Sequence, residues 1–138
     1  MRGRLICALL AGVNRAQPFL PKKERDDMGK KSGGVGGVDV IYCIAHSSSA
    51  SPSASAQALL FMYNLTVGTP QGGGEDGGGR YGGGGRGNSD QGRRSRDWFY
   101  HALYSRMSDP AMLSGKRHLT VYFNIIFKAL KNGADEED

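Results

Sequence analysis

The segment that decides the fold reads SRDWFYHALYSRMSDPAMLSGKRHLTVYFNIIFKALKN, residues 95–132. In its first half, Phe99, Leu103 and Met107 recur at intervals of four and therefore share one face of a helix. The proline of the Asp109-Pro110 pair ends this helix, because proline cannot continue the backbone hydrogen-bond ladder. The first half of the segment is thus predicted to be an amphipathic helix.

The second half, from Lys116 to Asn132, carries a polar stripe on an otherwise apolar helix. The polar residues recur at intervals of three, four, four and three: Arg117, Thr120, Asn124, Lys128 and Lys131. The alternative is a strand over residues 119–127, because β-forming side chains also alternate there. We favour the helix and expect the two helices to pack as a hairpin. The side chains expected to be buried together in that hairpin are Trp98, Phe99, Leu103, Phe123, Ile126 and Phe127.

Outside this segment the chain is poor in core-forming residues. Hydrophobic residues make up 38% of the 138 positions, and 22 positions are glycine. Glycine brings no apolar side chain to offset the conformational entropy lost on folding. The predicted fold class is therefore a mostly disordered, low-complexity chain with a short α-helical hairpin at residues 95–132. The alternative is a small α+β fold with strands at 38–45 and 119–127, because residues 38–45 are β-branched and apolar.

Composition divides the rest of the chain into segments. These are a targeting segment or short helix at 1–21, a flexible linker at 22–58 around the strand-like run 38–45, a short apolar segment at 59–67, a Gly/Arg-rich disordered linker at 68–94, and an acidic tail at 133–138.

The amino-terminal segment combines Arg2 and Arg4 with an apolar run over residues 5–13. This composition is typical of a secretory signal and, because no acidic residue precedes Glu24, also of an organelle transit peptide. A short buried helix is the third interpretation, so the sequence does not determine the localisation. No Cys-x-x-Cys pair is present, so the sequence does not support zinc or thioredoxin-like chemistry. We expect Cys7 and Cys43 to be small buried residues, with a single disulfide as the alternative if the protein is secreted.

The residues that catalysis needs are scattered in this sequence. The three histidines, His46, His101 and His118, are far apart along the chain, and the acidic residues cluster only in the C-terminal tail. Catalysis requires positioned acid–base or nucleophilic groups, and metal sites require clustered ligands. We therefore predict a non-enzymatic protein with no cofactor and no metal.

The leading functional hypothesis is a binding role for the C-terminal amphipathic module. An apolar helix with basic ends suits a groove on a protein partner or an anionic membrane surface. The residues assigned to this contact are Lys116, Arg117, Phe123, Ile126, Phe127, Lys128 and Lys131.

The run Gly79-Arg80-Tyr81-Gly82-Gly83-Gly84-Gly85-Arg86-Gly87 resembles the Gly/Arg/Tyr tails of glycine-rich RNA-binding proteins. In such tails arginine contacts phosphate, tyrosine stacks on bases, and glycine lets the backbone follow the strand. The resemblance implies contact with single-stranded RNA through Arg80, Tyr81 and Arg86. The basic cluster that follows adds Arg93, Arg94 and Arg96 to this second hypothesis. A flexible linker of biased composition is the alternative for the same stretch.

A third hypothesis concerns the whole chain. Selected folding sequences carry local signals that agree with one another. Here the helix and strand signals conflict, and Gly/Ser/Ala tracts separate the apolar runs. Such a pattern is also typical of an unselected or recently arisen open reading frame with no defined biochemical function.

Overall fold

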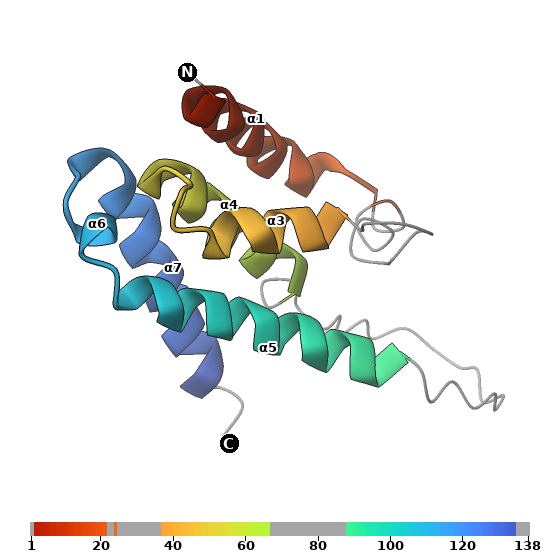
Figure 1. Ribbon diagram of the computed structural model, residues 1–138. Helices are drawn as coiled ribbons and strands as arrows, with labels where there is room; N and C mark the ends of the chain where they lie inside the picture. Colours follow the sequence, from red (N-terminus) through yellow and green to blue (C-terminus); the bar gives the residue numbers. More distant parts are fainter. Residues whose placement is uncertain (1, 22–23, 25–36, 67–87, 135–138) are drawn as a thin grey trace, which may run out of the picture.

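The computed structural model describes residues 2–21, 24, 37–66 and 88–134, and this part of the chain is almost entirely helical (Figure 1). Its elements are α1 (Arg2–Ala16), the 3-10 turn η1 (Gln17–Phe19), α3 (Gly37–His46), α4 (Pro52–Thr66), α5 (Asn88–Met107), α6 (Pro110–Leu113) and α7 (Lys116–Ala134). The described residues contain no β-strand.

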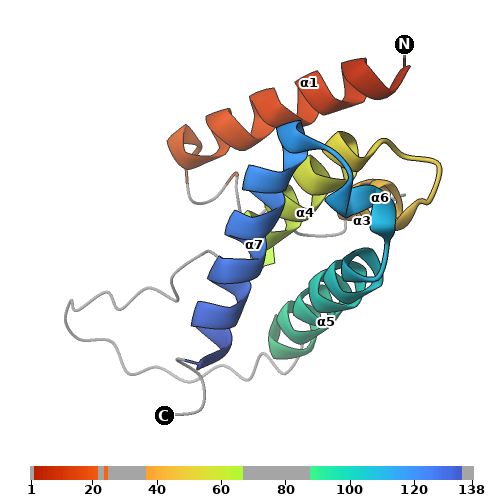
Figure 2. The same ribbon diagram turned by 90° about the vertical axis from the view of Figure 1, so that its left-hand side faces the viewer.

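Helix α4 is the centre of the fold. It contacts α1, α3, α5 and α7, and Figure 2 shows it between α7 and α3. The helix begins after Ser51, whose Oγ accepts a hydrogen bond from the Ala54 backbone N–H at 3.3 Å, and proline occupies its first position. Small buried residues such as Ala56 and Ala58 let neighbouring helices approach the α4 backbone closely. A helix with neighbours on several sides needs no single apolar face.

The other helices contribute residues to one core around α4. Its members outside α4 are Leu10 from α1, Ala45 from α3, Phe99, Ala102 and Leu103 from α5, Met112 from α6, and Tyr122, Ile125 and Ala129 from α7. The three α7 residues are spaced by three and four, so that one face of this helix is buried along its length.

The predicted fold class is wrong in both of its forms. Residues 38–45 lie in α3 and residues 119–127 lie in α7, so neither is a strand. β-Propensity reflects packing on a pleated surface more than an intrinsic backbone preference. In this chain both runs pack as helices against α4.

The prediction of a mostly disordered, low-complexity chain is equally wrong for the described residues. The flexible linker assigned to 22–58 contains α3 and the first turns of α4, and the apolar segment at 59–67 continues α4 as far as Thr66. Ala54, Ser55, Ala56 and Ala58 are buried packing residues of α4, although composition alone indicates a linker there. Residues 67–87, which hold most of the predicted Gly/Arg-rich linker, and residues 135–138 of the acidic tail lie outside the described residues.

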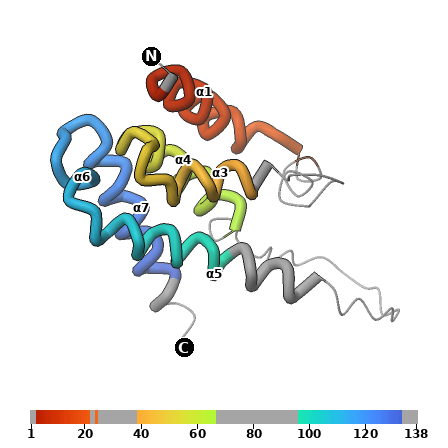
Figure 3. The backbone as a smooth tube through the Cα atoms, viewed as in Figure 1, coloured from red at the N-terminus to blue at the C-terminus, as the bar shows by residue number. Residues whose placement is uncertain are grey.

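The two C-terminal helices exist, but they do not pair as the predicted hairpin. Both contact α4, and the short helix α6 lies at the turn between them (Figure 3). Phe99 and Leu103 are buried and Ile126 packs against the core, as expected, whereas Trp98, Phe123 and Phe127 are exposed.

The amino-terminal segment forms α1, which packs on α4. The Asn14 side-chain amide donates to the backbone oxygen and to Oε1 of Gln57, both at 3.0 Å. A targeting role for these residues stays a prediction. Within the described ranges, no helix has the length and apolar character needed to cross a bilayer. Cys7 and Cys43 are free thiols, and Cys43 is exposed.

Candidate partner-binding surface

The outward side of α7 exposes a line of large apolar side chains. Phe123, Phe127 and Leu130 are 55%, 68% and 68% exposed. They are spaced by four and three, so they lie along one side of the helix. The buried side consists of His118, Tyr122, Ile125 and Ala129. Helix α7 is therefore apolar on two sides, and only one of them is covered by the described fold. We call Phe123, Phe127 and Leu130 the α7 stripe.

Basic side chains accompany the α7 stripe. Lys116, Arg117 and Lys131 are exposed, and α7 contains no acidic residue. Lys128 is half-buried, with its Nζ 5.9 Å from the centroid of the Tyr63 ring on α4. The helix thus presents an apolar line on a strongly basic element.

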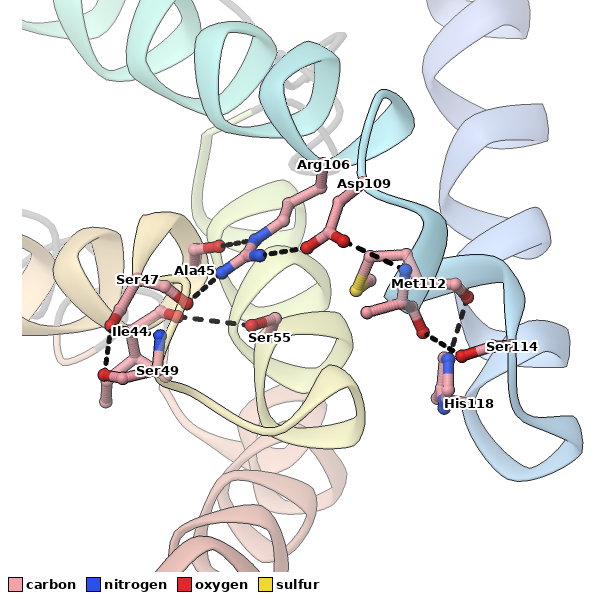
Figure 4. Close-up of polar contacts among 11 residues, drawn as sticks. Ile44, Ala45, Ser47, Ser49, Ser55, Arg106, Asp109, Met112, Ser114 and His118 are labelled. Carbon is pink, nitrogen blue, oxygen red and sulfur yellow. Dashed lines mark hydrogen bonds and ion pairs between the residues drawn. The ribbon is translucent and has the colours of Figure 1, made fainter.

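A polar junction at the α5–α6 connection links the end of α3 to α5 and α6 (Figure 4). Arg106, which is 5% exposed, donates from Nε to the Ala45 backbone oxygen at 2.7 Å and from Nη2 to the Ser47 backbone oxygen. Its Nη1 lies 2.7 Å from Oδ2 of Asp109. The guanidinium therefore satisfies carbonyl groups at the end of α3, which a helix leaves without intrahelical partners.

The same junction sets the start of α7. Asp109 caps α6 by accepting from the Ala111 backbone N–H at 2.9 Å. The buried His118 ring donates from Nε2 to the Met112 backbone oxygen at 2.8 Å, which links the first turn of α7 to α6. These bonds hold α7 at a fixed rotation about its axis, with the α7 stripe outward.

Two buried tyrosines on this side of the fold have shifted acidities. Burial raises the pKa of the Tyr122 hydroxyl; nearby Arg106 opposes the shift and Asp109 adds to it. Burial also raises the pKa of Tyr63, against the hydrogen bond that Asn132 on α7 donates to its hydroxyl at 2.8 Å. The Tyr122 hydroxyl has no hydrogen-bond partner among the described residues.

The structure describes only some of the residues predicted to bind nucleic acid. Arg80, Tyr81 and Arg86 lie outside the described residues. Arg93, Arg94 and Arg96 belong to α5, which starts well before the predicted position, and Arg96 is half-buried there. These three arginines are therefore helical residues and not part of a tail.

The residues predicted to bind a partner all lie on α7, but on different sides of it. Lys116, Arg117, Phe123, Phe127 and Lys131 are exposed. Ile126 and Lys128 are partly covered by the fold. Leu130 was not among the predicted residues, although its position three residues after Phe127 places it on the same side of the helix.

The histidines are less scattered in space than along the chain. His46 of α3 and His101 of α5 stack with ring centroids 5.5 Å apart. Across the described part of the chain, no group of three or more His, Cys, Asp or Glu residues could hold a metal ion.

Comparison with known proteins gives one informative similarity. The chain is 30% identical over 132 residues to the Ribosome biogenesis protein NOC1 of Chaetomium thermophilum. The matched region covers 96% of this chain but only 10% of that protein, so the chain spans about one tenth of the length of its relative. No protein-family profile and no solved structure matches the chain.

Proposed function

We propose that this chain is a non-enzymatic helical module of ribosome assembly that binds an acidic amphipathic helix of a partner protein on the α7 stripe. The exposed line Phe123, Phe127 and Leu130 carries the proposal. The relative named for ribosome biogenesis suggests the setting. Similarity along 96% of the chain and a consistent core also favour a selected protein over an unselected reading frame.

The spacing of the α7 stripe suits a helical partner. Helix-in-groove recognition uses apolar anchors at positions i, i+4 and i+7, which is the spacing of the stripe. Burying one such side chain stabilises a complex by roughly 1.5–3 kcal/mol before the costs of association. Three aligned anchors therefore provide a reasonable basis for a specific complex.

The charge of α7 selects among possible occupants. Lys116, Arg117 and Lys131 flank the stripe and no acidic residue offsets them. A second copy of this chain would bring like charges together, which opposes association. An acidic amphipathic helix would place leucine-like side chains on the stripe and carboxylates beside the lysines and arginine.

Catalysis is not part of the proposal. Arg106 and Asp109 form a close charged pair at the polar junction, and both bind helix ends. Arg106 donates to a carbonyl at the end of α3, and Asp109 caps α6. A binding module needs no reactive group, and this arrangement supplies rigidity.

The direct test uses a fluorescein-labelled peptide of 21 residues, built from three heptads of leucine and glutamate. Its binding to the full chain is measured by fluorescence anisotropy. The variant Phe123→Gln/Phe127→Gln should weaken binding about tenfold or more, because it removes two of the three anchors. The matched control Tyr104→Gln/Met107→Gln removes two exposed apolar side chains of α5, outside α7, and should bind as the parent chain does.

Other outcomes of the same experiment contradict the proposal. Equal weakening by both double variants would show that the stripe has no special role. Binding to phosphatidylserine vesicles without binding to the peptide would assign the face to a membrane. A concentration-dependent dimer in sedimentation that the Phe123/Phe127 variant abolishes would assign it to a second copy.

The cellular setting needs its own measurement. In cells that produce the protein, we expect it to co-sediment with precursor ribosomal particles in a sucrose gradient, and the Phe123→Gln/Phe127→Gln variant to shift toward the free fraction. A parent chain that is found only in the free fraction would overturn the role in ribosome assembly, whatever the peptide result.

A further inference from the structure

Four rings meet where α3 contacts α5. Helix α3 lies on the other side of α4 from α7 (Figure 2). Tyr42 and His46 come from α3, and Trp98 and His101 come from α5. The Tyr42 ring centroid lies 5.3 Å from that of Trp98 and 5.7 Å from that of His46. His46 and His101 stack with their planes 12° apart. The Tyr42 hydroxyl and Nδ1 of His101 are 3.3 Å apart. We call these residues the four-ring cluster.

The four-ring cluster is not part of the core. His46 and His101 are exposed and Trp98 is 37% exposed. Of the four residues, Tyr42 alone packs against the buried core. A tryptophan and two imidazoles held together by their neighbours at the surface form a preorganised aromatic platform, so little side-chain entropy is lost when a flat ligand stacks on it.

We infer that the four-ring cluster is a binding site for unpaired bases of single-stranded RNA. Every base has a π-face, so exposed aromatic rings bind successive bases with little sequence preference. The imidazole nitrogens, the indole N–H and the tyrosine hydroxyl can also form hydrogen bonds to base edges, which are accessible in single strands. The inference is independent of the α7 stripe.

The chain offers a direct probe because Trp98 is its single tryptophan. We expect 12-nucleotide oligouridylate or oligoadenylate to quench Trp98 fluorescence in the full chain, with an affinity that falls as salt rises. His101→Ala should weaken binding about fivefold or more, measured by anisotropy of labelled RNA, as for the loss of one stacking partner. Tyr104→Ala, which removes an exposed aromatic of α5 outside the cluster, is the matched control and should leave the affinity unchanged.

Circular dichroism of each variant checks that the helical content is retained, so that weakened binding reports on the site.

Several results would overturn the inference. These are the absence of any RNA effect on Trp98, equal weakening by Tyr104→Ala and His101→Ala, and stronger binding of duplex than of single-stranded RNA. Equal binding of the matching single-stranded DNA would remove the assignment to RNA. Loss of RNA binding in the Phe123→Gln/Phe127→Gln variant would show that the α7 stripe, and not the four-ring cluster, is the site.

Discussion

Replacing Arg106 with methionine should cost more stability than any other single change at the polar junction. The guanidinium is buried and serves three acceptors: the backbone oxygens of Ala45 and Ser47 and the carboxylate of Asp109. Methionine has a similar length and can fill the space, but it donates no hydrogen bond. Arg106→Met therefore leaves these acceptors without their donor while keeping the packing close to that of the parent chain.

The magnitude follows from the burial of each group. Removing one member of a buried ion pair destabilises a protein by about 3–5 kcal/mol, because the other charge stays buried and unpaired. The Asp109 side chain is 30% exposed, so water can partly replace the guanidinium there. Ala45 is fully buried and its oxygen has no such access. We expect a loss near the lower end, about 3 kcal/mol, against a typical unfolding free energy of about 5–15 kcal/mol.

Urea unfolding followed by circular dichroism and by Trp98 fluorescence measures this loss. The control is Asp109→Asn, which retains an oxygen to cap α6 and leaves the bonds from Arg106 to the α3 carbonyls in place. It should cost about 1 kcal/mol, the net value of one partly exposed charged contact. A loss below about 1 kcal/mol for Arg106→Met, or equal losses for both variants, would refute the assignment of Arg106 as the donor that holds α3 to α5.

Three further predictions concern the tyrosines and the glycines. Tyr122→Phe should leave the free energy of unfolding unchanged or raise it by up to about 1 kcal/mol, because the hydroxyl has no partner among the described residues. A decrease in the free energy of unfolding, measured with urea, would show that the hydroxyl does have a hydrogen-bond partner. Since burial raises the pKa of Tyr63 and Tyr122, the folded protein keeps these protons at a pH where the unfolded chain has released them. The contribution of these tyrosines to the free energy of unfolding is therefore fully present below the ordinary tyrosine pKa of about 10. It should be lost as the pH rises through the pKa values of the two tyrosines in the folded protein; a constant urea midpoint from about pH 9 to 11.5 would contradict this. Gly115→Ala would bring a Cβ within 2.7 Å of the His118 ring and should lower the free energy of unfolding by about 1 kcal/mol, because it displaces the hydrogen bond of that ring. Gly12→Ala in α1, where nothing lies within 4 Å of the added Cβ, should raise the free energy of unfolding by about 0.5–1 kcal/mol. Equal thermal midpoints for the two variants would contradict both expectations.

The helices nearest the C-terminus were predictable because their periodicity is strong. The spacing of Phe99 and Leu103 places both in the core, and Pro110 starts a new helix after α5 has ended. The polar residues of α7 also recur at helical intervals. In contrast, α3 is short, apolar and β-branched, so local residue preferences indicated a strand. Its helical state depends on contact with α4, which a reading of local pattern does not include.

The centre of the fold was missed because α4 has no amphipathic pattern. Its serine- and alanine-rich start looks like a linker, yet Ala54, Ser55 and Ala56 are buried. Small residues become core residues only when other helices lie against them, and that information is spread over the whole chain. Without α4, the two C-terminal helices had only each other as partners in the predicted hairpin.

The orientation of α7 could not be derived from its sequence for a related reason. A helix that is apolar on two sides contains no internal signal of which side faces the core. The buried side includes His118 and Tyr122, whose polar atoms make it look the more suitable side for solvent. The phenylalanines were therefore placed in the core, whereas the structure exposes Phe123 and Phe127 and buries His118, which bonds the Met112 backbone oxygen. A binding role for the exposed residues stays a prediction.

The position of α4 determines how the two proposed surfaces relate to each other. Helix α4 lies between α7, which carries the α7 stripe, and α3, which contributes to the four-ring cluster (Figure 2). A partner helix on one side and an RNA strand on the other would therefore not compete for space. Holding both ligands on one rigid module raises the effective concentration of each for the other, without any direct contact between them. This effect requires that the two surfaces stay at a fixed separation, which the packed core around α4 provides.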